Sequence, residues 1–153
     1  MIVALALLIG IVAGLRALTA PAAVSFAARF GYFDLAGTPF AFLGYQWTPW
    51  IFGILALAEL VGDQLPGTPS RKVPMQFGTR IVMGGLAGGA IGASGGMMVA
   101  GILAGIVGAV IGTLGGAAGR TRLAALFDRD RPAALIEDVI AIGGAVLVVG
   151  AVA

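Results

Sequence analysis

Four carboxylates lie in or beside apolar runs of this chain, and their types and spacing point most directly to chemistry. Glu59 and Asp63 are four residues apart in an apolar run, so they share one face of a helix. Glu137 and Asp138 lie about one turn into the last apolar run. A charged side chain costs about 2.5–3.5 kcal/mol near the centre of a membrane helix. We therefore expect these carboxylates to bind a ligand or to have ionic partners.

Basic residues accompany the carboxylates and suggest two interpretations. Arg71, Lys72 and Arg80 lie in or beside a polar loop, whereas Arg16 lies within the first apolar stretch. One interpretation is a polar site that binds a cation or proton through carboxylates, or an anion through arginines. The other is that the carboxylates pair with Arg80, Arg122 or Arg131 and only hold helix ends together. For Asp138, a further alternative is that it faces the headgroup region. The candidate binding residues are Arg16, Glu59, Asp63, Arg71, Arg80, Glu137 and Asp138.

The partner of Arg16 stays open at this point. Its side chain either extends outward past a helix break near Pro21 or neutralises a carboxylate inside the bundle.

The composition excludes several classes of chemistry. The chain has neither cysteine nor histidine, so it has no thiolate nucleophile, sulfur metal site or imidazole base. We expect no enzyme activity, no catalytic residues and no cofactor, and the sequence leaves open whether the carboxylates hold a metal. The net charge is +2, but no basic face with interleaved aromatic residues follows from it. We therefore expect no nucleic-acid partner.

Hydropathy predicts a membrane protein. The chain of 153 residues is 59% hydrophobic and 10% charged, against about 25% charged residues in ordinary soluble domains. Its apolar stretches cover 1–28, 48–64, 79–95, 97–118 and 133–152. We predict an all-α integral membrane protein in which residues 1–153 form a single transmembrane domain of about five helices. The first stretch is longer than a bilayer core requires, so it tilts or breaks near Pro21.

The segment Gly84–Gly119 is rich in glycine and alanine and carries no charge. Its glycines fall at 84, 88, 92 and 96 and again at 108, 112 and 116, which places each set on one helix face. Small residues at this spacing let helix backbones approach closely in a membrane. We predict a helical hairpin with a tight turn near Ser94–Gly96, which packs on itself, on another membrane protein or in a homo-oligomer.

Charge distribution predicts the orientation of this five-helix arrangement. The loops 65–80 and 119–132 then lie on one side, and only Arg29 lies on the other. The two loops hold Arg71, Lys72, Arg80, Arg120, Arg122, Arg129 and Arg131. Basic residues concentrate on the cytoplasmic side of membrane proteins. We therefore expect a cytoplasmic N-terminus and an external C-terminus.

One pair of segments, 10–18 followed by 56–63, is weakly similar to a second pair, 115–123 followed by 133–140. Each pair combines a small-residue helix that reaches an arginine with a helix that carries a glutamate. This arrangement is compatible with an inverted repeat of the kind found in transporters. Similar glycine and alanine content alone also accounts for the likeness.

Several short motifs together resemble a known family. They are Gly14-Leu15-Arg16 with Pro21, Glu59 with Asp63 and Pro66, Pro69-Ser70-Arg71 with Pro74 and Arg80, the glycine-rich pair of helices, and Ala134-Leu135-Ile136-Glu137-Asp138. This pattern is similar to small bacterial multi-span membrane proteins of the domain of unknown function 4126 family. The resemblance implies a bacterial inner-membrane location and no established activity. One departure is Gln64, where many relatives have a lysine.

These observations rank three functions. The first is a transporter or channel-like protein for an ion or small solute, which uses the embedded carboxylates and arginines. The second is a packing or assembly protein that acts through the glycine-rich hairpin. The third is a protein that binds lipid headgroups, since membrane lipids are its expected surroundings.

Overall fold

The computed structural model describes residues 1–62 and 74–152, and these residues form helices without any strand. The helices are α1 (Ile2–Leu15), α2 (Thr19–Arg29), the short 3-10 helix η1 (Ala41–Gly44), α3 (Thr48–Gly62), α4 (Pro74–Ser94), α5 (Met98–Phe127) and α6 (Asp130–Val152). The predicted all-α class is confirmed. Asp63 and Arg71 lie outside the described residues.

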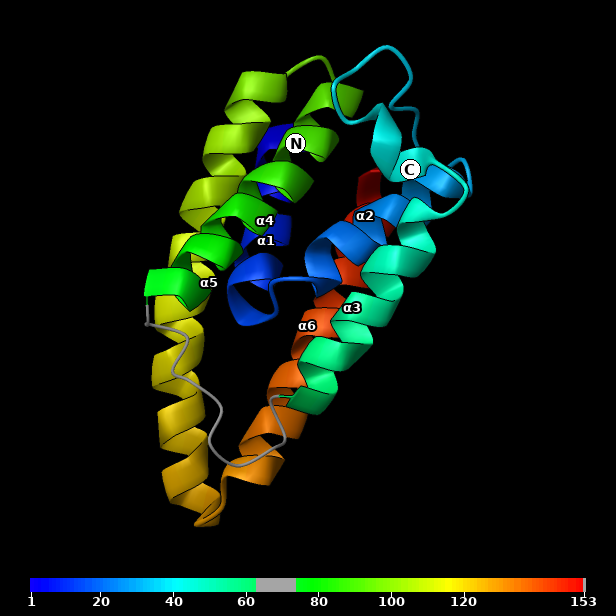
Figure 1. The fold of residues 1–153 in the computed structure, drawn as a ribbon. Coiled ribbons are helices and arrows are strands. Elements are labelled where there is room, and N and C mark those ends of the chain that lie inside the picture. The colour runs from blue at the N-terminus through cyan, green and yellow to red at the C-terminus, as the bar shows by residue number, and fades with distance from the viewer. Residues whose placement is uncertain (63–73, 153) are drawn as a thin grey trace.

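The first apolar stretch forms two short helices that are joined at Arg16–Leu18 (Figure 1). The predicted break near Pro21 is therefore misplaced by about one turn. Pro21 is the third residue of α2, where the backbone has no helical acceptor and proline loses no hydrogen bond. The break needs another explanation, which the side chains around it provide.

The chain reverses direction at this break, so that α1 and α2 form a hairpin. Glycines of α1 face α5 in parallel order, with Gly10 against Gly105 and Gly14 against Ala109 and Thr113. The other arm lies along α3 in antiparallel order. Phe26 near the end of α2 packs edge-on against Trp50 near the start of α3, with ring centroids 5.4 Å apart. We call α1 and α2 the hairpin and Arg16–Leu18 its tip.

The reversal also determines where the described ends of the chain lie. Helices α3, α4, α5 and α6 alternate in direction, while α1 and α2 turn back within the bundle (Figure 1). Both described ends therefore lie at the same end of the bundle. The first apolar stretch is thus a pair of short helices, and the expected number of five membrane spans stays a prediction.

Glycines allow three helices to pack closely. In α4, Gly88 lies against the backbone of Gly101 and Gly105 in α5, and Gly84 lies against Gly105. In α5, Gly108 faces the backbone of α1. The predicted turn between the two glycine-rich helices is present, and Gly96 adopts φ 74° there. Gly96 therefore belongs to the turn and not to a helix face.

Helix α5 is longer than expected because it continues to Phe127, where the predicted span ended at 118. Its 30 residues correspond to about 45 Å. By length and composition, α5 and residues 131–152 of α6 could each cross a membrane, among the residues that the structure describes. The added turns place Arg120 inside a helix rather than in a connecting loop.

The segments of the proposed inverted repeat have different backbones. Residues 10–18 contain the end of α1 and the tip, whereas 115–123 lie within the continuous helix α5. The likeness between them therefore does not extend to their backbone conformation.

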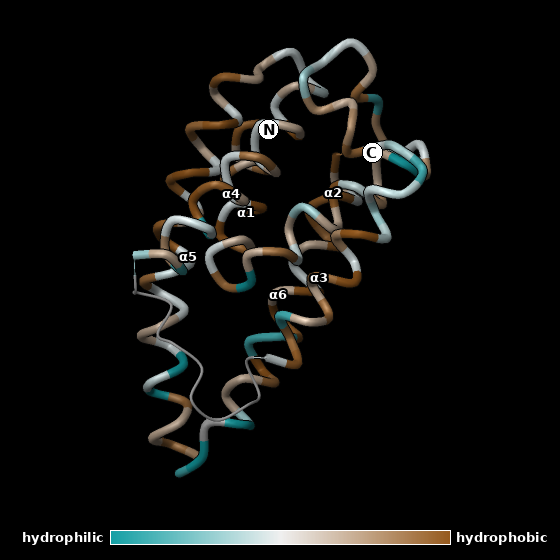
Figure 2. Tube along the Cα trace, in the orientation of Figure 1, coloured by the Kyte–Doolittle hydropathy of each residue, from teal (hydrophilic) through white to brown (hydrophobic). Residues whose placement is uncertain are grey.

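Residues along the helices are mostly hydrophobic, and hydrophilic residues are more frequent toward the two ends of the bundle (Figure 2). One end carries the loop after α2 and the start of α3, where four aromatic side chains are exposed, namely Tyr32, Tyr45, Trp47 and Trp50. The other end carries the turn from α5 to α6 with the exposed Arg122, Arg129 and Arg131. Between these ends, Leu5, Ile9 and Val12 of α1 share a core with Ala141, Ala145 and Val148 of α6.

Candidate functional site

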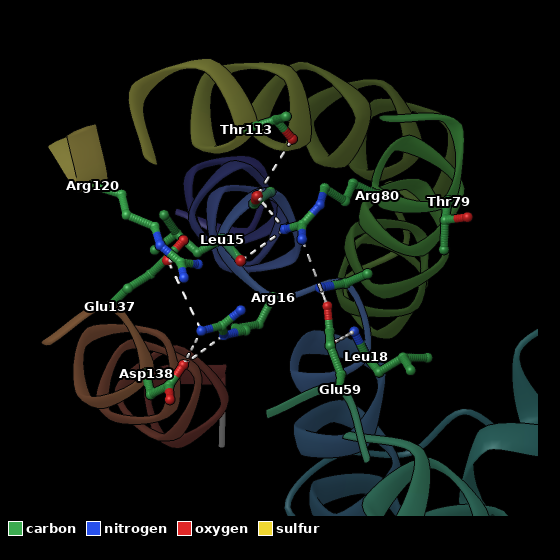
Figure 3. A network of polar contacts seen from close by, with 12 residues as sticks. Leu15, Arg16, Leu18, Glu59, Thr79, Arg80, Thr113, Arg120, Glu137 and Asp138 are labelled. Carbon is green, nitrogen blue, oxygen red and sulfur yellow. Dashed lines mark hydrogen bonds and ion pairs between the residues drawn. The ribbon is translucent and has the colours of Figure 1, made fainter. Parts of the chain in front are cut away.

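The tip of the hairpin leaves polar backbone groups without helical partners. A helix ends with carbonyls and begins with amides that its own turns cannot satisfy. At the tip, the last carbonyls of α1 and the first amides of α2 lie three residues apart in the interior of the bundle. Arg16 and Ala17 are both buried there, so water cannot replace the missing bonds. Charged side chains from other helices fill this role (Figure 3).

Glu59 of α3 satisfies amides at the start of α2. The Ala17 amide donates to Glu59 Oε1 at 2.8 Å, and the Leu18 amide donates to Oε2 at 2.9 Å. A carboxylate at this position also interacts favourably with the positive end of the helix dipole. Both carboxylate oxygens are thus used to hold one helix end that is more than forty residues away in the sequence.

Arg80 of α4 satisfies carbonyls at the end of α1. Its Nη1 donates to the carbonyl oxygens of Gly14 and Leu15, each at 2.7 Å. The hydroxyl of Thr113 in α5 makes a longer bond of 3.4 Å to the Gly14 oxygen. A guanidinium at this position complements the negative end of the α1 dipole. Arg80 is 3% exposed and its Nη2 lies 3.8 Å from Glu59 Oε1, so the two capping groups also form an ion pair.

Arg16 points from the tip toward α6. Its Nε donates to Asp138 Oδ1 at 2.6 Å, and its Nη2 also contacts this oxygen. The same Nη2 lies 3.9 Å from Glu137 Oε2, which accepts a 3.5 Å bond from Arg120 of α5. Arg16 therefore neutralises carboxylates inside the bundle and does not extend outward. Asp138 faces this arginine and not the headgroup region.

Six ionisable side chains surround the tip in two ion-paired groups that the tip backbone links, and we call them together the charged cluster. It comprises Arg16, Glu59, Arg80, Arg120, Glu137 and Asp138. Its three guanidinium groups and three carboxylates balance when all are ionised. Exposure is uneven, because Arg16 is fully buried whereas Glu59 and Asp138 keep 14% and 13% of their side-chain surface. Arg120 keeps 18%, so these three side chains are the members of the cluster that remain partly accessible.

Sequence reasoning found most of this cluster. It brought together Arg16, Glu59, Arg80, Glu137 and Asp138, which the structure places in one network, while Asp63 and Arg71 lie outside the described residues. The suggested pairing of a carboxylate with Arg80 is present, and the alternatives Arg122 and Arg131 are exposed.

Two polar contributors were missed. Arg120 was assigned to the 119–132 loop, and Thr113 was not singled out. Arg120 follows directly after the glycine stripe, and the apolar residues Leu123 and Ala124 come soon after it. This pattern could have indicated that the helix continues through Arg120.

The cluster offers cations little room beside its own arginines. Among the described residues, no group of three or more carboxylates is placed to hold a metal ion. Each carboxylate in the cluster already lies near a guanidinium. In this arrangement, carboxylates and guanidinium groups can exchange ionic partners more readily than they can bind a divalent metal tightly.

Comparison with family models identified one match. The family described as "Domain of unknown function (DUF4126)" matches residues 3–151, which is nearly the whole chain. Comparisons with curated proteins and with solved structures returned no match.

Proposed function

The chain belongs to the DUF4126 family, whose description assigns no activity, and from the charged hairpin tip we propose a small multi-pass membrane protein that transports an ion or small solute. In a bilayer, non-helical backbone is tolerated only where it is buried in protein or lines an aqueous cavity. Broken helices at membrane depth commonly form the binding sites of transporters. The observation that carries the proposal is a backbone reversal whose two helix ends are capped by ionised side chains.

The depth of the tip supports this proposal. Helix α1 has 14 residues, or about 21 Å, so the hairpin would reach about two thirds of the way through a hydrocarbon core of ~30 Å. The exposed aromatic residues would lie at the interface where the chain enters, as aromatic belts do. The charged cluster would then lie below the midplane, nearer the arginine-rich end.

Charge balance suggests how the cluster could couple to a moving ion. In its resting state, the three carboxylates and three guanidinium groups compensate one another. If a proton or cation neutralises Glu59, the amides of α2 and the guanidinium of Arg80 lose their anionic partner. An anion or a conformational change must then restore the balance, since an unpaired buried charge is unfavourable. Such a device would respond to ions without a preformed metal site.

Loss of one carboxylate charge is expected to abolish transport. In proteoliposomes with dyes for protons, potassium and chloride, and in swelling assays with small neutral solutes, wild-type protein should show flux above empty liposomes. Glu59→Gln should lose this flux, because the amide offers one acceptor oxygen to two backbone donors and no charge to Arg80. Asp138→Asn provides a second test, since it neutralises the partner of Arg16.

The control for these variants is Asp34→Asn, which makes the same charge change in an exposed loop. It should keep wild-type flux. Absence of flux for every probe with wild-type protein would reject the transport proposal. Wild-type flux in both cluster variants would reject a role of the charged cluster in transport. In either case the charged cluster would serve only to fasten the hairpin, which is the second interpretation of its ion pairs.

We also propose an orientation from the positive-inside rule. The α5–α6 turn would lie in the cytoplasm because it carries Arg122, Arg129 and Arg131, and both termini would lie on the opposite side of the inner membrane. The chain has no cysteine, so single cysteines can report exposure. Gln46→Cys should react with a membrane-impermeant maleimide in intact bacteria, whereas Ala125→Cys should react only after lysis. The reverse pattern would invert the proposed orientation.

A further inference from the structure

A lateral cavity of about 320 Å³ lies between α1, α5 and α6, outside the capping contacts of the hairpin tip. Its volume is near the lower limit of small-molecule sites. The walls are almost entirely aliphatic or glycine, and Arg120 and Glu137 provide the charged groups. Ile111 and Ile140 line it and are half-exposed, so the cavity opens on the side of the bundle and not at its ends.

Glycines create the space in this cavity. A Cβ atom added to Gly115 or Gly119 would meet no atom within 4 Å, in contrast to Gly105 and Gly108 earlier in α5, where it would overlap neighbouring backbone. The close approach of helices that explains the other glycines therefore does not explain these two. Together these two glycines leave a trough along one face of α5.

A helix of a second copy is about 10 Å across with its side chains. A flexible hydrocarbon chain is narrower and matches the apolar walls. The polar exception, Arg120, keeps 18% of its side chain exposed beside Glu137, and a guanidinium has five donors in all. It can therefore donate to a second acceptor while it pairs with Glu137.

Charge favours an anionic amphiphile at this position. Arg120 lies in the part of α5 that leads to the α5–α6 turn, and Arg122, Arg129 and Arg131 lie in or near that turn. Arginines bind phosphate groups well because their planar donors match the phosphate oxygens. We propose that the cavity binds one acyl chain of an anionic phospholipid, with its phosphate at Arg120. The site shares Arg120 and Glu137 with the charged cluster, but lipid binding there does not depend on transport.

The test compares two lipids with identical acyl chains, phosphatidylglycerol and phosphatidylcholine. In detergent, added phosphatidylglycerol should raise the unfolding temperature by several degrees more than phosphatidylcholine, and native mass spectrometry should show about one retained lipid per chain. Gly115→Leu should fill part of the trough and remove most of this response, since a Cβ atom at Gly115 meets no atom within 4 Å. Arg120→Gln should keep a response to both lipids but lose the preference for the anionic one.

Gly150→Leu is the matched control, because that glycine of α6 is also exposed and open, yet does not line the cavity. It should respond to lipid as wild type does. Equal shifts for the two lipids in wild-type protein would overturn the proposal, as would an unchanged response in Gly115→Leu. A dimer in lipid-free detergent that Gly115→Leu converts to a monomer would assign the trough to a second copy and also overturn it.

Discussion

Arg16→Met is expected to lower the free energy of unfolding by about 3–5 kcal/mol, because it leaves buried carboxylates without their cation. Arg16 is fully buried and contacts Asp138 through both Nε and Nη2. Methionine fills a similar volume but provides no donor. Glu137 retains Arg120 as a partner, so the loss falls mainly on Asp138. The measurement is unfolding in mixed detergent micelles, with wild-type protein run in parallel.

Two companion variants separate charge from geometry at this position. Arg16→Lys keeps the charge but reaches Asp138 from a single nitrogen, so we expect a loss between those of wild type and Arg16→Met. The double variant Arg16→Met with Asp138→Leu should recover part of the stability, since an apolar pair can replace a buried ion pair.

Arg29→Met is the control for arginine loss at an exposed position of α2. It should change the free energy of unfolding by no more than about 0.5 kcal/mol. If Arg16→Met were as mild as Arg29→Met, the ion pair with Asp138 would not hold the tip to α6. The picture of a hairpin fixed by charge would then be wrong.

The sequence was informative where local spacing determines the structure. The glycine stripes predicted close packing of two helices, and Ser94–Gly96 predicted the turn between them. The scarcity of charge in apolar runs singled out five residues that the charged cluster unites. In each case the signal lies within a few residues of the feature that it predicts.

The hairpin tip could not be located from the sequence, because its stability comes from residues that are distant along the chain. No glycine or proline occurs at Arg16–Leu18. Pro21 instead led to a predicted break about one helical turn too late in the chain. The groups that satisfy the tip are Glu59 and Arg80, which come from α3 and α4. Because the reversal was not predicted, there was no reason to expect both described ends of the chain at the same end of the bundle. A short local break thus changes the path of the whole first stretch.

Gly105→Ala is expected to lower the free energy of unfolding by about 3 kcal/mol, at the upper end of the typical cost of overpacking. The added Cβ would overlap the carbonyl oxygen of Gly84 and lie 3.0 Å from the Cα of Gly88. Both are backbone atoms of α4, so no side chain can rotate away and the two helices must separate. On its other side, the Gly105 backbone crowds Gly10 of α1, which limits movement in that direction.

Gly115→Ala on the same helix makes the same chemical change in open space. It should leave stability unchanged or raise it by up to about 1 kcal/mol, because alanine favours helix more than glycine does. Thermal unfolding of both variants in one detergent therefore isolates the effect of helix approach from that of helix propensity. In a bilayer, where lipid tails are as apolar as the core, such close contacts carry much of the helix association. Equal stability of the two variants would mean that α4 and α5 can move apart at no cost, and the three-helix packing around Gly105 would not hold this fold together.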